Sequence, residues 1–135
     1  MPLAGGGRQR IATRQAVLQQ IEYAADGKTI YFTGYENDTL RLYRVAAAGG
    51  AVTQMIDGRA HDASVSPDGR HIAFGSRSAE TMSSSLGIVT GSALRTLDLK
   101  GGMYRWHPRG DAISFVREEN GRMDLWLQPL SGGAP

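Results

Sequence analysis

Cysteine is absent from the chain, which excludes disulfide bonds and metal sites built on thiolates. No apolar run approaches the roughly 20 residues that a membrane-spanning helix needs. The first seven residues, MPLAGGG, lack the apolar centre of a secretory signal peptide. A cysteine-free chain suits the cytoplasm and the periplasm equally, so these absences predict no membrane insertion and leave the compartment open.

Clustered charge and catalytic motifs are also missing. The net charge is only +2, and the 15 basic residues are scattered, whereas binding to nucleic acid needs clustered basic residues. His61, His71 and His107 have no neighbours at metal-ligand spacing. The sequence contains no Gly-x-Ser-x-Gly elbow, no His-Glu-x-x-His pair and no phosphate-binding loop. We therefore expect no nucleic acid, metal, cofactor or catalytic residue, and predict that the chain is not an enzyme.

Glycine, by contrast, is abundant, and it marks an internal repeat. Three segments align without gaps: residues 23–32 (YAADGKTIYF), 65–74 (VSPDGRHIAF) and 106–115 (WHPRGDAISF). Their glycines, Gly27, Gly69 and Gly110, lie 42 and 41 residues apart, within the period of about 40–45 residues of a four-stranded propeller blade. A glycine at this place supplies the positive φ of a hairpin turn.

The residues around each turn predict the strands. Apolar side chains alternate after it, at Ile30 and Phe32 in the first repeat, so they share one face of a sheet. Residues 42–50 match residues 125–133 and read as third strands, and residues 51–56 and 93–99 read as fourth strands. Helix propensity favours a short helix in residues 8–21, but the repeat frame places a first strand at 17–23, and we prefer the frame because tertiary context overrides propensity.

The predicted fold is therefore all-β: a β-propeller of three four-stranded blades, either half of a six-bladed ring or a fragment of a larger propeller. Residues 1–135 form a single repeat array. Its repeats span approximately residues 17–56, 62–99 and 103–135, with residues 3–13 as an extra outer strand.

Segment 65–74 resembles the hallmark Trp-Ser-Pro-Asp-Gly-Arg-x-Ile-Ala-Phe of TolB-like propeller repeats, bacterial relatives of the WD-repeat propellers. It differs from that hallmark at Val65, while the third repeat keeps Trp106 and Pro108. The resemblance implies a non-catalytic scaffold that binds a protein, a peptide or another ligand, and it favours a periplasmic or otherwise extracytoplasmic location. Alternatives are the gating propeller of a prolyl-oligopeptidase-like peptidase or sensor kinase, and an engineered or excised fragment without a function of its own.

The expected contact surface is the mouth of the propeller channel, because loops before the innermost strands crowd there. Polar and aromatic groups at these positions suit contact with a peptide or small ligand. The candidate residues are Gln20, His61, Asp62, Met103 and Tyr104. Trp106 and Trp126, which fall within alternating strands, are expected to be core or blade-interface residues.

The ends of the chain predict an assembly. Residues 2–6 (PLAGG) and 129–133 (PLSGG) stand 127 residues apart, three repeat periods, so the last blade lacks a fourth strand and the N-terminus offers a spare one. Three blades are fewer than the usual four to eight of a closed ring. We therefore predict a homodimer that completes a six-bladed ring, each spare strand completing the last blade of the other chain.

Overall fold

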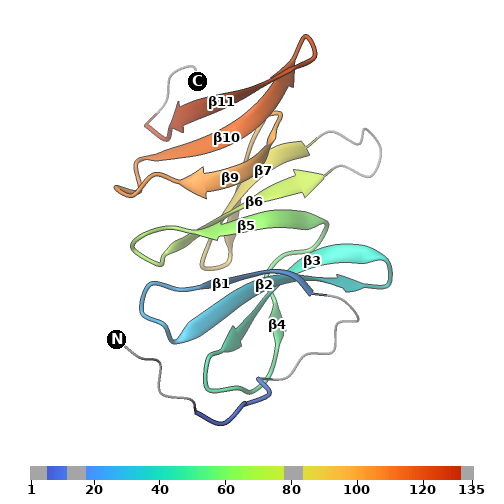
Figure 1. The fold of residues 1–135 in the computed structure, drawn as a ribbon, viewed down its shortest axis with the longest axis vertical. Coiled ribbons are helices and arrows are strands. Elements are labelled where there is room, and N and C mark those ends of the chain that lie inside the picture. The colour runs from blue at the N-terminus through green and yellow to red at the C-terminus, as the bar shows by residue number, and fades with distance from the viewer. Residues whose placement is uncertain (1–5, 12–17, 78–83, 132–135) are drawn as a thin grey trace.

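The computed structural model describes residues 6–11, 18–77 and 84–131, and within these ranges every regular element is a β-strand (Figure 1). The strands form three antiparallel sheets. The first sheet consists of β1 (Leu18–Tyr23), β2 (Thr29–Glu36), β3 (Thr39–Ala46) and β4 (Thr53–Gln54). The second consists of β5 (Ala60–Val65), β6 (His71–Arg77), β7 (Ser84–Thr90) and β8 (Ala93–Leu97). The third consists of β9 (Gly102–Trp106), β10 (Ala112–Glu119) and β11 (Arg122–Pro129).

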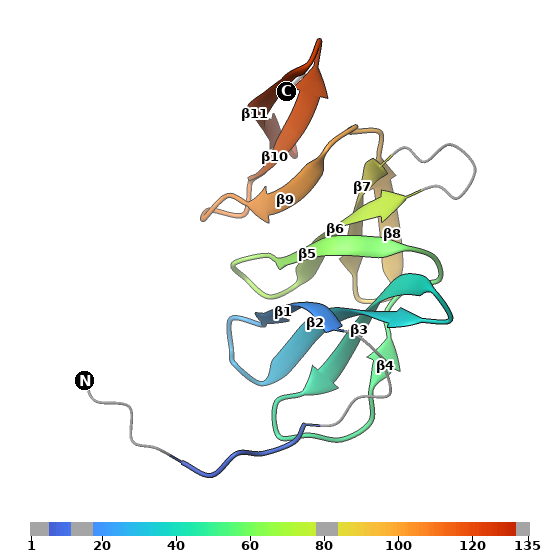
Figure 2. The same ribbon diagram turned by 45° about the vertical axis from the view of Figure 1, so that its right-hand side comes forward.

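The three sheets are the predicted blades, stacked in chain order (Figures 1 and 2). Each is a meander in which consecutive strands pair, and β1, β5 and β9 are the first strands. Gly27, Gly69 and Gly110 all have positive φ, 67°, 72° and 74°, as the hairpin turns require. No barrel is closed, so the described part of the chain is an open arc of a propeller.

Two details differ from the sequence prediction: the lengths of the outer strands and the structure of residues 6–11. β4 covers only residues 53–54 of the predicted 51–56, and β8 ends at Leu97, where the Leu99 amide donates to the Leu97 carbonyl at 2.7 Å and turns the chain. Among described residues the third blade has three strands, in line with the fourth strand that the ends of the chain predict to be missing. Residues 6–11 form no strand; the Gln9 side chain instead donates to the carbonyl of Ala48 at 3.1 Å. The rest of the predicted outer strand lies outside the described residues.

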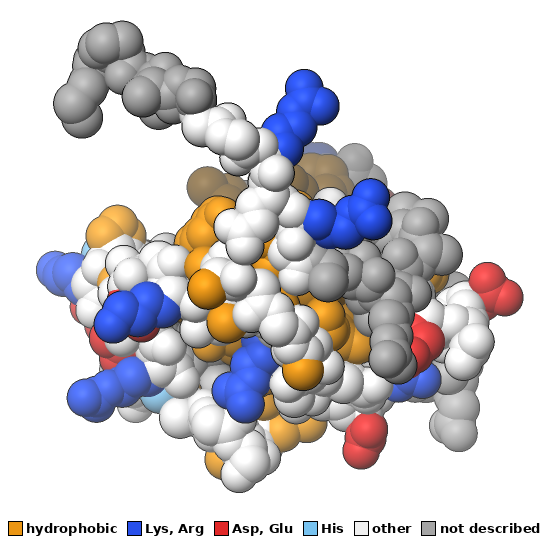
Figure 3. Space-filling view, turned by 90° about the horizontal axis from the view of Figure 1, so that it is seen from below, with side chains coloured by type: hydrophobic (Ala, Val, Ile, Leu, Met, Phe, Trp, Pro, Cys, Tyr) orange, Lys and Arg blue, Asp and Glu red, His pale blue; other side chains and the backbone are white. Residues whose placement is uncertain are grey.

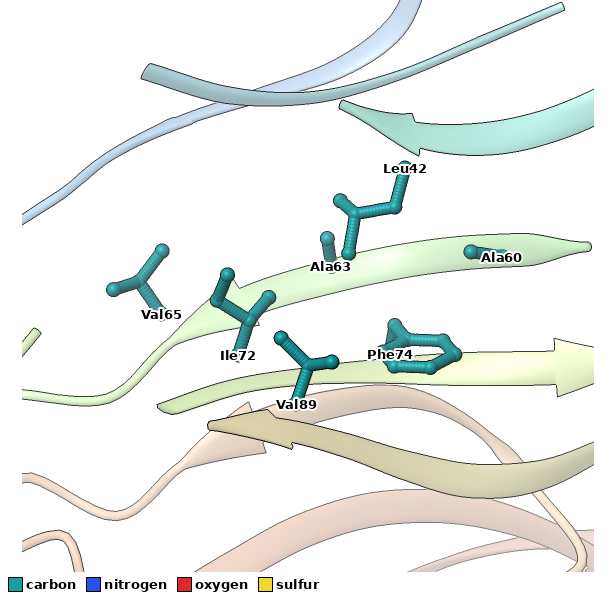
Figure 4. Close-up of a cluster of buried hydrophobic side chains, with 7 residues drawn as sticks. All are labelled: Leu42, Ala60, Ala63, Val65, Ile72, Phe74 and Val89. Carbon is teal, nitrogen blue, oxygen red and sulfur yellow. The ribbon is translucent and has the colours of Figure 1, made fainter. Parts of the chain in front are cut away.

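Two of the three clusters of buried apolar side chains lie between blades, and the third lies on the outer face of the first blade. Seven buried side chains join the first two blades: Leu42, Ala60, Ala63, Val65, Ile72, Phe74 and Val89 (Figure 4). A second cluster joins the second and third blades through Ala73, Leu86, Ile88, Tyr104, Ile113 and Phe115. The alternating apolar residues predicted from the repeat supply both clusters, as the period of two requires.

Two polar links fix the position of the second blade on the first. The Gln20 side-chain amide donates to the Ala63 carbonyl at 2.8 Å, and the Val65 amide donates to the Glu22 carboxylate at 2.9 Å. Both links satisfy backbone groups of β5 from side chains of β1. They orient the blades as well as joining them, because hydrogen bonds, unlike apolar contacts, depend on direction.

Candidate binding face

The first strand of every blade is irregular near its beginning. The pairing of first and second strands shifts register in all three blades: between Leu18 and Gln20, between His61 and Ser64, and opposite residues 114–116. Gln20, Asp62 and Met103 occupy the same repeat position, seven residues before each turn glycine. Asp62 and Met103 have positive φ, 51° and 56°. Such bulges change the directions of side chains, here at residues that the sequence predicts to lie near one another.

Contacts place four of the five predicted residues in a row across neighbouring first strands. Gln20 reaches the carbonyl of Ala63, the residue after Asp62. The Asp62 carboxylate accepts a hydrogen bond from the His61 Nδ1 at 2.9 Å and a longer one from the Met103 amide at 3.4 Å. Met103 remains 62% exposed. The row thus combines polar groups with one exposed apolar side chain.

Tyr104 does not belong to this row. Its side chain has no exposed area, and its hydroxyl donates to the carbonyls of Leu99 and Gly101 at 2.7 and 3.0 Å. Burial, followed by the charge of the Asp62 carboxylate, raises the pKa of Tyr104 to about 12. Tyr104 is adjacent to Met103 in a strand and therefore points to the opposite face, into the core between the blades.

His61 is held in a fixed orientation. Its ring lies where a Cβ of Gly75 would be, because a methyl group built there would come within 2.1 Å of the ring. A carboxylate only accepts, so the hydrogen bond to Asp62 places a proton on Nδ1. In the neutral ring Nε2 is then an acceptor, and it faces the Ser84 hydroxyl at 3.5 Å.

A pocket of about 250 Å³ opens beside this histidine, between the first and second blades. The tip of the β2–β3 hairpin forms one wall, and residues from β5, β6 and β7 form the other. The lining residues are Tyr35, Asp38, Leu40, Arg59, Ala60, His61, Arg77 and Ser84. Only His61 among them was predicted from the sequence. Tyr35 and Arg77 share a repeat position, eight residues after the turn glycines.

The two tryptophans are interface residues, as predicted. Both pack against the cluster between the second and third blades. The Trp106 indole donates to the Ser64 carbonyl at 2.9 Å, and the Arg117 guanidinium lies 5.7 Å from the centre of the Trp126 ring. Trp106 thus provides the second interface with a polar link of its own.

No group of three or more metal-ligating side chains occurs within the described ranges. Nor do those ranges contain a helix long and apolar enough to cross a membrane.

The end face of the third blade exposes residues whose counterparts are buried. Leu42, Leu86 and Leu125 occupy one repeat position, since each pairs with the residue six after a turn glycine. They are 0%, 0% and 78% exposed, because the first two are covered by the following blade. Met123 and Leu127 are also exposed on the third blade.

The first blade has the complementary end face. Ile21, Ala63 and Tyr104 share a position six residues before the turn glycines, and they are 60%, 2% and 0% exposed. Tyr23, two residues further along β1, is 56% exposed. Seen from this end, hydrophobic side chains gather at the centre of the molecule, with basic side chains around them (Figure 3). The two end faces are thus equivalent to the two halves of one internal blade interface.

Comparison with solved structures identifies the class of fold. The chain has the fold of the TolB β-propellers. It superimposes on TolB from Acinetobacter baumannii with a TM-score of 0.80 at 21% identity, and on a protein assigned as TolB from Agrobacterium tumefaciens with a TM-score of 0.76 at 23% identity. These alignments cover 98% and 90% of this chain but only 35% and 49% of the two TolB chains. No protein-family model matches the sequence, and no curated protein matches it significantly.

Proposed function

We propose that this chain is a non-catalytic propeller scaffold that binds a protein or peptide partner at the face where its first strands begin. The observation that carries the proposal is the row formed by Gln20, His61, Asp62 and Met103, which borders the pocket between the first two blades. Side chains that are fixed by hydrogen bonds and left partly exposed suit recognition, because little conformational freedom is lost when a partner binds. The TolB-like fold supports this role.

Peptides selected from a displayed random library against the purified chain test the proposal. Binding should be lost in His61→Ala, which removes the side chain at the centre of the row. His71→Ala is the matched control, because His71 begins β6 at the opposite end of the same blade. Selected peptides that bind both variants as tightly as the unchanged chain would place the contact surface elsewhere.

The non-catalytic part of the proposal needs its own test, because Ser84, His61 and Asp62 follow the order of an acyl-transfer triad. The distance of 3.5 Å between the Ser84 hydroxyl and His61 Nε2 is at the limit of a hydrogen bond. We expect p-nitrophenyl acetate to be hydrolysed at the same background rate by the unchanged chain and by Ser84→Ala. A rate that falls in Ser84→Ala would refute the proposal.

We also propose that two copies of the chain assemble into a six-bladed ring. The third blade of one copy would cover the first blade of the other, and the same contact would form twice about a two-fold axis. The support is the exposure of Leu125 and Ile21, whose counterparts are buried in both internal interfaces. Closure of the ring would bury these exposed apolar side chains, and exposed apolar patches of this kind promote association.

The N-terminal segment bears on how the ring closes. In the single chain Ile11 packs against the apolar cluster on the end face of the first blade, beside Phe32 and Tyr43. A second copy covering that face would displace Ile11. The displaced segment is the spare strand expected from the sequence, and the unpaired edge of β11 is where it would pair.

Light scattering during size-exclusion chromatography measures the assembly directly. We expect a mass of twice 14.5 kDa for the unchanged chain and a monomer for Leu125→Glu. Leu94→Glu is the matched control, because Leu94 is 53% exposed but lies on the outer strand β8. A stable monomer of the unchanged chain at high protein concentration would refute the dimer and leave the binding face untested by this measurement.

A further inference from the structure

We infer that Arg105 of one copy of the chain stacks on the ring of Tyr23 of the other copy, and that this contact is the polar link at which the six-bladed ring closes. The inference rests on the proposed assembly of two copies and names the side chains that recognise each other across it. It follows from the polar links of the two internal interfaces, which use the same two repeat positions.

Each internal interface joins the position five residues before one turn glycine to the position four residues before the next turn glycine. In the first interface the Glu22 carboxylate accepts a hydrogen bond from the Val65 amide at 2.9 Å. In the second interface the Ser64 carbonyl accepts a hydrogen bond from the Trp106 indole at 2.9 Å. The atoms differ, but the same two strand positions meet, so a third interface of this geometry would bring the same positions together.

In the proposed ring these positions belong to Arg105 of the third blade and to Tyr23 of the first blade of the other copy. The two blades lie at opposite ends of the stack, and one face of each is not covered by another blade (Figure 1). Arg105 pairs with Ser114, which pairs with the exposed Leu127. Tyr23 pairs with Ile30 of the apolar cluster on the outer face of the first blade. Since paired residues of antiparallel strands share a face, both side chains lie on the end faces that the ring would join.

Both side chains are available to a partner. Tyr23 is 56% exposed, whereas its counterparts Val65 and Trp106 pack against the clusters between blades. In the part of the chain that the structure describes, the Tyr23 ring has no aromatic or cation–π contact. Arg105 is exposed, forms no ion pair with a described residue, and donates to the Tyr104 carbonyl at 2.8 Å. Hydrogen bonds of a guanidinium lie in its plane, so this one does not prevent a ring from stacking on its face.

The chemistry of the two residues selects a cation–π contact. A guanidinium only donates, so Arg105 cannot accept a hydrogen bond from a backbone amide as Glu22 does. A tyrosine in place of Val65 instead presents an aromatic face, on which a guanidinium stacks favourably. Exposed apolar side chains, Leu125 on the third blade and Ile21 on the first, would exclude water around the contact. Desolvation of this kind strengthens a cation–π contact.

The dissociation constant of the dimer, measured by analytical ultracentrifugation, tests the inference. We expect Arg105→Gln and Tyr23→Leu each to raise it roughly twofold to thirtyfold, the range that corresponds to one cation–π contact. The effect of the double variant should be smaller than the product of the single effects, because both substitutions remove the same contact. Tyr23→Phe keeps the ring and should dimerise like the unchanged chain. Arg109→Gln is the matched control, because Arg109 is an exposed arginine of the same blade that pairs with Asp111 in the turn at 3.1 Å.

A pair of introduced cysteines measures the proximity directly, because the chain has no cysteine of its own. A mixture of Arg105→Cys and Tyr23→Cys, treated with a short bis-maleimide, should give a covalent dimer of twice 14.5 kDa. Neither variant should cross-link by itself, because equivalent positions lie on opposite sides of a two-fold ring.

Several outcomes would overturn the inference. A dimer whose dissociation constant is unchanged in Arg105→Gln and in Tyr23→Leu would refute the contact and leave the proposed assembly intact. Single effects that multiply in the double variant, a loss in Tyr23→Phe as large as in Tyr23→Leu, or no cross-link in the mixture would do the same. A monomeric unchanged chain at high protein concentration would refute the assembly and the contact together. Melting curves confirm that each variant is folded.

Discussion

Truncating the equivalent leucines of the second and third blades should have very different effects on stability. Leu86 is fully buried between blades, against Tyr104, Ile113 and Phe115. Leu86→Ala removes this contact and leaves a cavity, so we expect a loss of about 3 kcal/mol in the free energy of unfolding, within the usual range of about 2–5 kcal/mol. In a chain of this size such a loss lowers the melting temperature by about 10 °C.

Leu125→Ala makes the same chemical change at the same repeat position. Leu125 is 78% exposed, so only about a fifth of its surface is buried. Full burial of a leucine contributes about 1.5–3 kcal/mol, and a fifth of that is roughly 0.5 kcal/mol. The expected ratio between the two losses is therefore about six, although the residues, the strand position and the substitution are identical.

Urea unfolding followed by tryptophan fluorescence measures both losses, because Trp106 and Trp126 lie in the third blade. The protein concentration should be low enough to keep the chain monomeric. Equal losses for the two variants would refute the assignment of Leu125 to an uncovered face. At high protein concentration the unchanged chain is expected to be dimeric. The loss in the apparent free energy of unfolding caused by Leu125→Ala should then be larger, because the monomer–dimer equilibrium contributes to apparent stability.

Three further predictions concern single interactions. Gly69→Val should lower the melting temperature clearly in a thermal melt, because a β-branched residue tolerates the φ of 72° badly; an unchanged melt would exclude this turn type. Trp106→Phe should lower the free energy of unfolding in urea by about 1 kcal/mol, since it leaves the Ser64 carbonyl without its indole donor; no loss would show that water replaces the bond. Hydrogen bonds from the Ser66 hydroxyl and then from the Arg70 amide hold the pKa of Asp68 below its usual value, so its contribution is complete above the unfolded pKa near 3.8 and is lost as the pH falls through the lower folded pKa. Asp68→Asn should therefore lower the melting temperature at pH 7 and have little effect once Asp68 is protonated; an equal effect at both pH values would contradict this.

Much of the fold was predictable because the repeat recurs in frame. The turn glycines and the alternation of residues such as Ile72 and Phe74 are local signals that one sequence displays directly. The boundaries of the outer strands were less predictable. β4 and β8 each pair with one neighbour only, so the length of each depends on local turns such as that between Leu97 and Leu99.

The candidate face was predictable only in part. The repeat frame placed Gln20, His61 and Asp62 near one another, since first strands of neighbouring blades lie side by side. It gave the wrong exposure for Tyr104, because the bulge at Met103 determines which of the two adjacent side chains points outward. Arg59 was not predicted, because its approach to the β2–β3 hairpin depends on how two blades pack, which no local pattern records.

The polar links between blades differ from one interface to the next. The two internal interfaces share their apolar positions, so apolar contact alone would not distinguish one blade from another as a packing partner. Their links differ: Gln20 and Glu22 bind backbone groups of β5 across the first interface, whereas the Trp106 indole binds the Ser64 carbonyl across the second. A permuted order would leave some of these groups buried without a partner, at about 1–3 kcal/mol each. The two internal interfaces are therefore chemically distinct although their apolar positions are the same. A second copy of the chain that packs against an end blade would also have to match its polar groups.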